Sequence, residues 1–189
     1  WEWWGSRAWL QGRRPGARTS ERDDRRSEAS DTWEFFARHV GRQSHHLPPD
    51  NVQTLPQLMV AERTSPTNIG LYLLSAACAR RLKLISTDEF LDRCENTLQT
   101  LAKLQRHRGH FLNWYDTRTL QPLAPLYVST VDSGNLCGHF EATAGACAEL
   151  LYTQSPAYAA SACTQQQQQR LQALEAHFHR LAMRAGFAF

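Results

Sequence analysis

The chain has 189 residues, a length that fits one domain of ordinary size. Its formal charge is only +3, and the basic excess lies mostly within residues 7–26 rather than on a defined face, so the composition does not indicate a nucleic-acid-binding protein. The sequence contains no run of about 18–20 apolar residues and no recognisable signal peptide, so any membrane attachment is expected to come from parts outside this sequence.

Residues 1–30 differ in composition from the rest of the chain. Several tryptophans are followed by a stretch rich in Arg, Asp, Ser and Gly that lacks apolar periodicity, which predicts a disordered or junction segment. From Asp31 onward the pattern changes to helical spacing, with Asp31 or Thr32 as the N-cap. The expected helix is short, ends near Gly41, and carries the apolar residues Trp33, Phe36 and Val40.

Two further helix starts are clearly marked. Ser65 can cap a helix whose first position is Pro66, where the missing N–H costs nothing. Residues 69–82 are apolar nearly all round, which predicts an inner helix. The segment 86–89 (STDE) is a capping box that opens an amphipathic, outer helix. Its apolar face contains Phe90, Leu91, Cys94, Leu98, Leu101 and Leu104.

The helical period disappears between residues 109 and 128, which predicts a short hairpin or extended excursion. Asp132 or Ser133 is then expected to cap a helix that runs to Leu151. A break at Ser155 and Pro156 and a run of five glutamines precede a last helix, for which the glutamines form a solvated start. The apolar face of that helix contains Leu171, Leu174, Phe178 and Leu181.

Metal or disulfide chemistry is not indicated. The five cysteines are an odd number without CxxC spacing, and four fall at predicted helical positions, which favours buried free thiols. The histidines show neither HExxH nor Cys/His spacing, and no phosphate-binding glycine loop or nucleotide fingerprint is present. We therefore expect no metal and no cofactor in this chain.

Three polar and aromatic segments stand out: 63–74 (RTSPTNIGLYLL), 109–116 (GHFLNWYD) and 129–135 (STVDSGN). Each adjoins a predicted helix, and together they suggest a sugar-binding cleft. Asp132 is the carboxylate that we single out, at a loop-to-helix junction beside the small residues Ser133 and Gly134. Position alone leaves a second interpretation open, in which Asp132 only caps a helix, at about 0.5–2 kcal/mol.

The side chains around Asp132 suit carbohydrate recognition. Trp114 and Tyr115 have flat faces that can stack on sugar rings, although Trp114 could equally be a core aromatic. Arg63 can bind a sugar hydroxyl or a carboxylate. The other residues that we expect to contact a sugar are Thr67, Asn68, His110, Asn113, Asp116, Ser133 and Asn135. Thr67 and Asn68 could merely cap their helix, and Asp116 could merely close a turn. Glu62 is a weaker acidic candidate.

The amino-acid sequence of these three segments resembles that of the glycoamylase-like (α/α) domain of bacterial cyclic β-1,2-glucan synthases. This domain is related to the endo-β-1,2-glucanases. The resemblance runs from about Trp33 to the end of the sequence. It implies an all-α fold, the N-terminal portion of an (α/α)6 double toroid spanning residues 31–189. In the related glucanases the residue matching Asp132 belongs to the catalytic centre.

The resemblance also implies an activity. The whole domain would join the ends of linear β-1,2-glucan by transglycosylation, in a multi-pass protein at the cytoplasmic face of the bacterial inner membrane. Its second acidic catalytic residue is expected in a WGISES-like segment that this sequence lacks, so this piece alone should be inactive. The alternatives are a hydrolase, as in the endo-β-1,2-glucanases, and a noncatalytic carbohydrate-binding module.

Overall fold

The computed structural model describes residues 17–152 and 163–186, and it confirms an all-α fold. Its helices are α1 (Ala17–His39), α2 (Pro66–Arg81), α3 (Thr87–Leu101), α4 (Thr130–Tyr152) and α5 (Gln165–Gly186), with a short 3-10 helix, η2 (Arg42–Ser44). The expected break at Ser155 and Pro156 lies outside the described residues, as do residues 1–16 of the expected lead-in.

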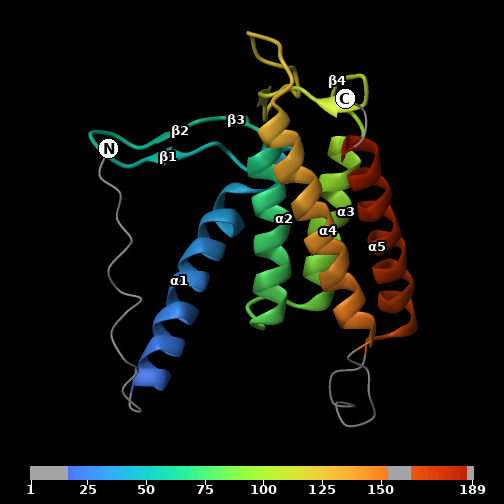
Figure 1. The fold of residues 1–189 in the computed structure, drawn as a ribbon. Helices are drawn as coiled ribbons and strands as arrows, with labels where there is room; N and C mark the ends of the chain where they lie inside the picture. The colour runs from blue at the N-terminus through green and yellow to red at the C-terminus, as the bar shows by residue number, and fades with distance from the viewer. Residues whose placement is uncertain (1–16, 153–162, 187–189) are drawn as a thin grey trace.

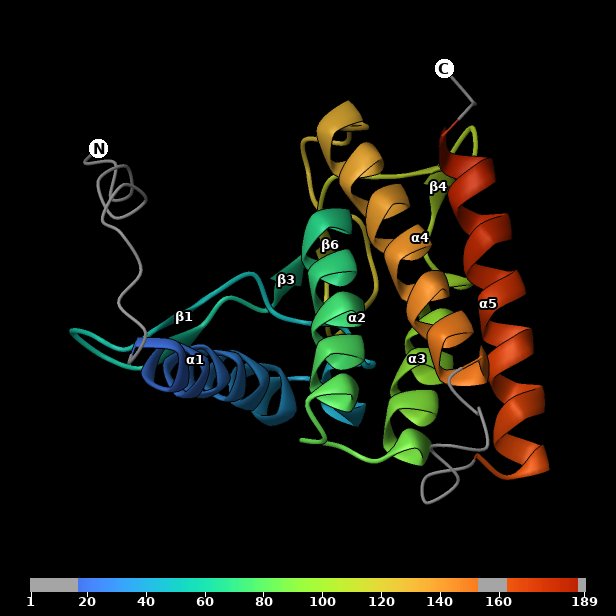
Figure 2. The same ribbon diagram turned by 60° about the horizontal axis from the view of Figure 1, so that its bottom comes forward.

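Four helices pack side by side, with α2 and α5 each in contact with both α3 and α4 (Figure 1). Helix α1 contacts α2, and its axis runs away from the four-helix bundle, as Figure 2 shows from below. The N-termini of α2 and α4 lie at the same end of the bundle. The described core combines the predicted faces of the helices, including Tyr72, Phe90, Phe140, Leu171 and Phe178, all fully buried.

The predicted boundary at Asp31 was wrong, because α1 begins at Ala17 and continues through it. The segment that precedes Trp33 has no apolar stripe, and most of its described side chains, such as Asp24, Arg26 and Glu28, are exposed. A helix that faces solvent lacks the apolar periodicity on which the prediction depended. The predicted stripe itself was right: Trp33, Phe36 and Val40 are buried.

Both marked helix starts are confirmed. The Ser65 hydroxyl accepts a hydrogen bond from Asn68 N at 3.2 Å, with Pro66 as the first residue of α2. The Ser86 hydroxyl accepts from Glu89 N at 3.1 Å and caps α3. Local capping chemistry therefore fixes where these two helices begin.

The strands are two residues long and form three antiparallel pairs among the described residues. Strand β1 (Val52–Gln53) pairs with β2 (Met59–Val60), and β4 (Arg106–His107) pairs with β5 (His110–Phe111). Strand β3 (Arg63–Thr64) pairs with β6 (Tyr115–Asp116). The expected excursion is therefore present. Its strand β6, however, pairs with β3, which precedes α2 and lies about fifty residues earlier in the sequence.

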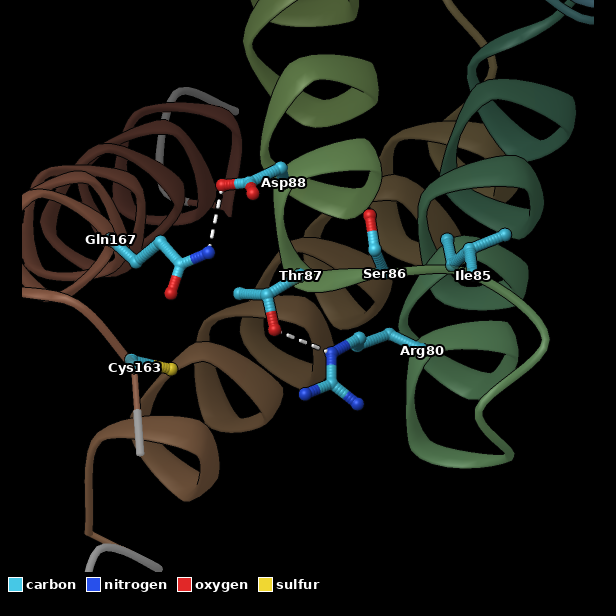
Figure 3. Close-up of a pocket in the computed structure, with 7 residues that line it drawn as sticks. All are labelled: Arg80, Ile85, Ser86, Thr87, Asp88, Cys163 and Gln167. Carbon is cyan, nitrogen blue, oxygen red and sulfur yellow. Dashed lines mark hydrogen bonds between the residues drawn. The ribbon is translucent and has the colours of Figure 1, made fainter. Parts of the chain in front are cut away.

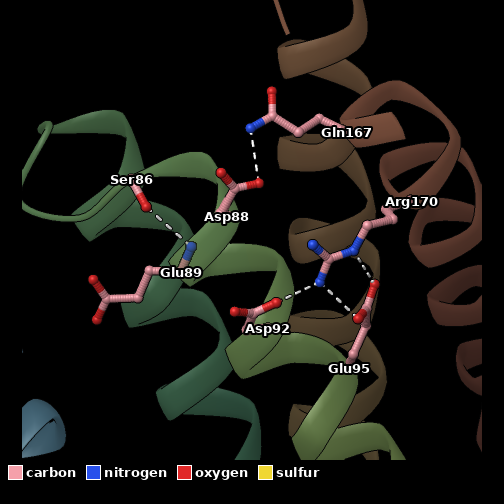
Figure 4. A network of polar contacts seen from close by, with 7 residues as sticks. All are labelled: Ser86, Asp88, Glu89, Asp92, Glu95, Gln167 and Arg170. Atoms are coloured by element: carbon pink, nitrogen blue, oxygen red, sulfur yellow. Dashed lines mark hydrogen bonds and ion pairs between the residues drawn. The ribbon is translucent and has the colours of Figure 1, made fainter. Parts of the chain in front are cut away.

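A network of charged and polar side chains joins the N-terminal part of α5 to α3 (Figure 4). Arg170 donates to Asp92 at 2.6 Å and to Glu95 at 2.8 and 2.7 Å. The hydrogen bonds to Glu95 are the main reason why the pKa of Arg170 rises further above its ordinary value. Gln167 adds a hydrogen bond to Asp88 at 2.8 Å. Polar contacts thus reinforce the packing of α5 against α3.

Gly70 permits the close approach of α2 and α4. A Cβ at this position would lie 2.6 Å from Nδ1 and 2.9 Å from Cβ of His139. We expect Gly70→Ala to lower the free energy of unfolding by about 1–3 kcal/mol, because the helices must separate to relieve the clash. Gly138→Ala is the matched control, since nothing lies within 4 Å of its added Cβ. Chemical denaturation should show a neutral or stabilising effect for the control, and equal effects would contradict this packing role.

The five cysteines are free, in agreement with the prediction, but they differ in exposure. Burial raises the pKa of Cys94 well above its ordinary value and that of Cys147 to about 12, so few thiolates form at neutral pH. Cys78 is exposed. We expect a thiol reagent to label Cys78 rapidly and to label Cys94 and Cys147 only after denaturation. Peptide mass spectrometry checks this, and rapid labelling of Cys94 in the native protein would contradict it.

Candidate functional site

The structure brings the three predicted segments together at the end of the bundle where α2 and α4 begin. The ladder between β3 and β6 places Arg63 opposite Asp116 and Thr64 opposite Tyr115. In addition, the hydroxyl of Thr67 donates to Oδ1 of Asp132 at 2.6 Å and so connects α2 to α4. Hydrogen bonds between residues about 50 to 65 positions apart in the sequence thus assemble the site.

Asp132 lies in the first turn of α4, and it does not cap the helix. The cap is Ser129, whose hydroxyl accepts from Asp132 N at 3.1 Å, so the expectation that Asp132 or Ser133 would cap was wrong. The Ser-x-x-Asp spacing at 129–132 is itself a helix-start signal that could have indicated this. The carboxylate of Asp132 is therefore available for contacts outside its own helix.

Asn113 holds the second oxygen of this carboxylate. The hydrogen-bond partners of Asn113 assign the orientation of its amide: the oxygen accepts from the Trp114 indole N–H and the Tyr127 hydroxyl, and the nitrogen donates to Asp132 Oδ2 at 2.9 Å. The backbone N–H of Asn113 also donates to the carbonyl of Tyr127 at 2.9 Å. Asn113 is only 5% exposed, so its orientation is fixed by surrounding protein.

We call Thr67, Asn113, Asp132 and Asn135 the Asp132 cluster. The amide of Asn135 donates to the Thr67 hydroxyl at 3.2 Å, which completes a chain of hydrogen bonds from α4 to α2 and back. Asp132 is partly exposed and Asn135 is exposed. A carboxylate held by two neutral donors, with an exposed amide beside it, can receive a polar ligand without first breaking an ion pair.

Arg63 and Trp114 form a stacked pair beside the cluster. The Arg63 guanidinium lies 4.7 Å from the centre of the Trp114 ring, and Trp114 is partly exposed. Arg63 also donates to Asp50 Oδ2 from Nε at 3.1 Å and from Nη2 at 3.0 Å. Asn68, which we expected to contact a sugar, donates to Asp50 Oδ1 at 3.3 Å.

The expected role of Tyr115 as a stacking platform was wrong, because Tyr115 is fully buried. Its hydroxyl donates to Gln105 O at 2.6 Å and accepts from Leu112 N at 2.7 Å. Burial raises its pKa to about 12. His110 and Ser133 are also buried, at 3% and 4% exposed, and offer almost no surface to a ligand in this structure.

Asp116 closes the turn after β6, which was one of the two roles expected for it from the sequence. Its Oδ1 accepts from the backbone N–H groups of Arg118 and Thr119, each at 2.8 Å. Partial desolvation acts to raise the pKa of Asp116, but these hydrogen bonds outweigh it and the pKa falls below its ordinary value. Glu62, the weaker candidate, forms an exposed ion pair with Arg118 at 3.3 Å.

Two residues of the site were missed from the sequence. Asp50 follows the Pro48-Pro49 pair in a loop without periodicity, and its partner Arg63 becomes adjacent only after folding. Tyr127 lies at the end of the excursion, where its hydroxyl donates to the amide oxygen of Asn113 at 2.6 Å. A carboxylate directly after two prolines was the available signal for Asp50.

Among the described residues, no group of three or more His, Cys, Asp or Glu side chains could hold a metal ion. A separate hollow of about 350 Å³ lies near the opposite end of the bundle, lined by Arg80, Thr87, Asp88, Cys163 and Gln167 among others (Figure 3). It shares no residue with the Asp132 cluster. In the part of the chain that the structure describes, no helix is long and apolar enough to span a membrane.

Comparison with solved structures defines the class of fold. A glucoamylase-like protein of Bacteroides fragilis matches with a TM-score of 0.58 at 16% identity, over 82% of this chain and 35% of that one. An endo-β-1,2-glucanase of Chitinophaga pinensis, solved with sophorotriose and glucose, matches with a TM-score of 0.57 at 14% identity, over 81% and 34%. The chain therefore has the helical (α/α) fold that these structures share, and spans about a third of their length.

The family follows from the sequence. The family described as "Protein of unknown function (DUF3131)" matches residues 27–134, more than half of the chain, and the chain belongs to it. The matched range contains Asp50, Arg63, Asn113 and Asp132. Over 127 residues the chain is also 48% identical to the cyclic β-(1,2)-glucan synthase NdvB of Rhizobium meliloti (strain 1021). That match covers 67% of this chain and 4% of the synthase. The resemblance noted from the sequence is confirmed.

Proposed function

We propose that this chain is part of the glucan-processing domain of a cyclic β-1,2-glucan synthase, and that it acts on linear β-1,2-glucan by cyclising transglycosylation. The observation that carries the proposal is the Asp132 cluster, in which Thr67 and Asn113 hold a carboxylate without an ion pair. The identity to a glucan synthase supports the choice of substrate. A carboxylate held in this way can serve in glycosidic bond cleavage.

Glycoside cleavage or transfer normally requires two carboxyl groups, one on each side of the bond. Within the described residues that we place at the site, the other acidic side chains, Asp50 and Asp116, are engaged by Arg63 and by backbone N–H groups. We therefore propose that the second catalytic carboxyl group comes from another part of a longer polypeptide. The chain alone is expected to be inactive on β-1,2-glucan.

Transglycosylation and hydrolysis differ in the nucleophile. In cyclisation a hydroxyl of the glucan itself attacks, one glycosidic bond breaks while another forms, and the number of reducing ends stays constant. In hydrolysis water attacks and each event adds one reducing end. The second candidate, an endo-β-1,2-glucanase, is favoured by the likeness of the fold to such an enzyme.

The test uses the native full-length protein and linear β-1,2-glucan. Mass spectrometry detects cyclic products, which weigh one water less than linear glucans of the same size, and a reducing-end assay counts hydrolysis. Cyclic products at a constant number of reducing ends are expected. New reducing ends without cyclic products would favour the hydrolase, and binding without any turnover would favour a noncatalytic module.

The location of the protein is part of the same proposal. We place the chain at the cytoplasmic face of the bacterial inner membrane, within a larger multi-pass protein whose other domains are its partners. The family resemblance supports this placement. The described residues contain no membrane-spanning helix. Attachment would therefore use other segments. Fractionation of cells with an antibody against this chain tests it.

A further inference from the structure

Asp50 accepts four hydrogen bonds from neighbouring side chains. Its Oδ2 receives Nε and Nη2 of Arg63, at 3.1 and 3.0 Å, and the amide of Asn51 at 3.0 Å. Its Oδ1 receives the amide of Asn68 at 3.3 Å. The Asp50 side chain is 18% exposed, whereas that of Arg63 is 51% exposed. The carboxylate therefore anchors an arginine that itself faces solvent.

The loop that carries Asp50 is fixed to the core. The buried hydroxyls of Thr97 and Thr100 in α3 donate to the carbonyls of His46 and His45, at 3.0 and 2.7 Å. Further along, Asp50 N donates to Ala61 O at 3.2 Å, which attaches the loop to the segment before β3. These bonds hold the position of the Asp50 backbone, so its carboxylate is preorganised for Arg63.

Arg63 contacts Asp50 and Trp114 at the same time. Asp50 engages the guanidinium through Nε and Nη2, along one edge of its plane. The guanidinium then lies over the Trp114 ring, 4.7 Å from its centre. Because Trp114 donates its indole N–H to Asn113, which holds Asp132, the stack is joined to the Asp132 cluster.

Asp50 also acts on the first turn of α2. Asn68 donates to Asp50, while the preceding residue, Thr67, donates to Asp132. Two carboxylates from distant parts of the chain thus bind successive residues of one helix start. A shift of this turn would move the hydroxyl that holds Asp132.

We propose that Asp50 is a positioning residue of the glucan-binding surface, which orients the Arg63–Trp114 stack and the first turn of α2 beside Asp132. This inference rests on the proposed function. Asp50 does not serve as the catalytic acid or base itself, because its Oδ2 already accepts three hydrogen bonds, two of them from a guanidinium. The ligand that this surface would receive is a β-1,2-linked glucan chain, with Trp114 as its platform.

The experiment is a double-mutant cycle in the native full-length protein. Linear β-1,2-glucan oligosaccharides are titrated by calorimetry into the wild type, Asp50→Asn, Trp114→Ala and the double variant. We expect Asp50→Asn to weaken binding about tenfold, because the charged hydrogen bonds that orient Arg63 are lost. In the Trp114→Ala background the same change should cause a clearly smaller loss, because only the contact of Asp50 with the first turn of α2 remains to be broken. The melting temperature should change little, and KM should rise more than kcat falls.

A matched control removes another arginine–carboxylate pair. Arg81 and Glu149 join α2 to α4 far from the site, at 3.0 Å, and Glu149→Gln should leave glucan affinity unchanged. Arg63→Lys is a second probe, which should reproduce the loss because an ammonium group cannot form the same planar stack and two-point contact. It also tests the inference if Asp50→Asn does not fold.

The outcomes separate this inference from the proposed function. Affinity of Asp50→Asn within twofold of the wild type, or a loss that adds fully to that of Trp114→Ala, would overturn the positioning role. A wild type that binds no β-1,2-glucan would instead reject the proposed function. In that case the indole N–H resonance of Trp114 still reports on Asp50: a shift in Asp50→Asn supports the structural part, and an unmoved resonance overturns it.

Discussion

Asp132→Asn is expected to lower turnover of linear β-1,2-glucan by about 10²–10⁴-fold in the native full-length protein, while folding and glucan binding persist. The change removes the ionisable group and keeps the shape of the side chain. Ser129 caps α4, so the helix start is untouched. The amide oxygen can still accept from the Thr67 hydroxyl, which now makes the 2.6 Å bond to Asp132. A loss of stability of up to about 3 kcal/mol is the most that one charged hydrogen bond should cost.

Three measurements make this expectation specific. Product formation gives kcat, calorimetry gives the affinity for the glucan, and thermal melting gives the stability. Asp92→Asn is the matched control, because it makes the same chemical change within the distant Arg170 network (Figure 4). The control should retain full turnover. Turnover of Asp132→Asn within a few-fold of the wild type would assign Asp132 a structural role in joining α2 to α4.

The parts of the fold that could be predicted from the sequence depend on nearby residues. The starts of α2 and α3 follow from Ser65 and Ser86, which bond to backbone N–H groups three residues on. The buried faces of α3 and α5 follow from apolar spacing. The start of α1 could not be predicted because a solvent-facing helix carries no such spacing, and its residues 18–28 are all polar.

For the site, the sequence predicted several of the residues but not the contacts that they make. Arg63, Thr67, Asn113, Trp114 and Asp132 were predicted from the polar segments, and the structure brings them together. What the sequence could not provide was the partner of each side chain. The pairing of β3 with β6 joins residues that are distant in sequence. The contact of Asp50 with Arg63 involves a residue in a loop. No periodicity in the sequence marks either contact.

Trp114 directly precedes β6 and Tyr115 is its first residue, and the two side chains show why direction matters in a short extended segment. Neighbouring side chains of an extended segment point to opposite sides. The pairing of Tyr115 with Thr64 therefore sends Tyr115 into the core and leaves Trp114 partly exposed beneath Arg63. The composition of the segment alone gives both residues the same expected role.

The two aromatic residues should consequently respond in opposite ways to truncation. Trp114→Ala is expected to weaken binding of linear β-1,2-glucan at least about tenfold, because the apolar face that covers the sugar is removed. Its stability should fall by only about 1 kcal/mol, for the lost bond to Asn113. Tyr115→Ala should instead cost about 3–5 kcal/mol, as for other large aromatic side chains removed from a core. That variant also loses the two hydrogen bonds of its hydroxyl, to Gln105 and Leu112.

Denaturation and calorimetry on both variants distinguish a platform from a core residue. Tyr115→Phe is the conservative partner, since it keeps the ring in the core and removes only the hydroxyl. It should fold and bind glucan with nearly the affinity of the wild type. If Trp114→Ala instead unfolds the protein while the remaining folded fraction binds glucan normally, Trp114 is a structural residue. The ligand surface would then have to be sought around the exposed Asn135 and Gly134 rather than beneath Arg63.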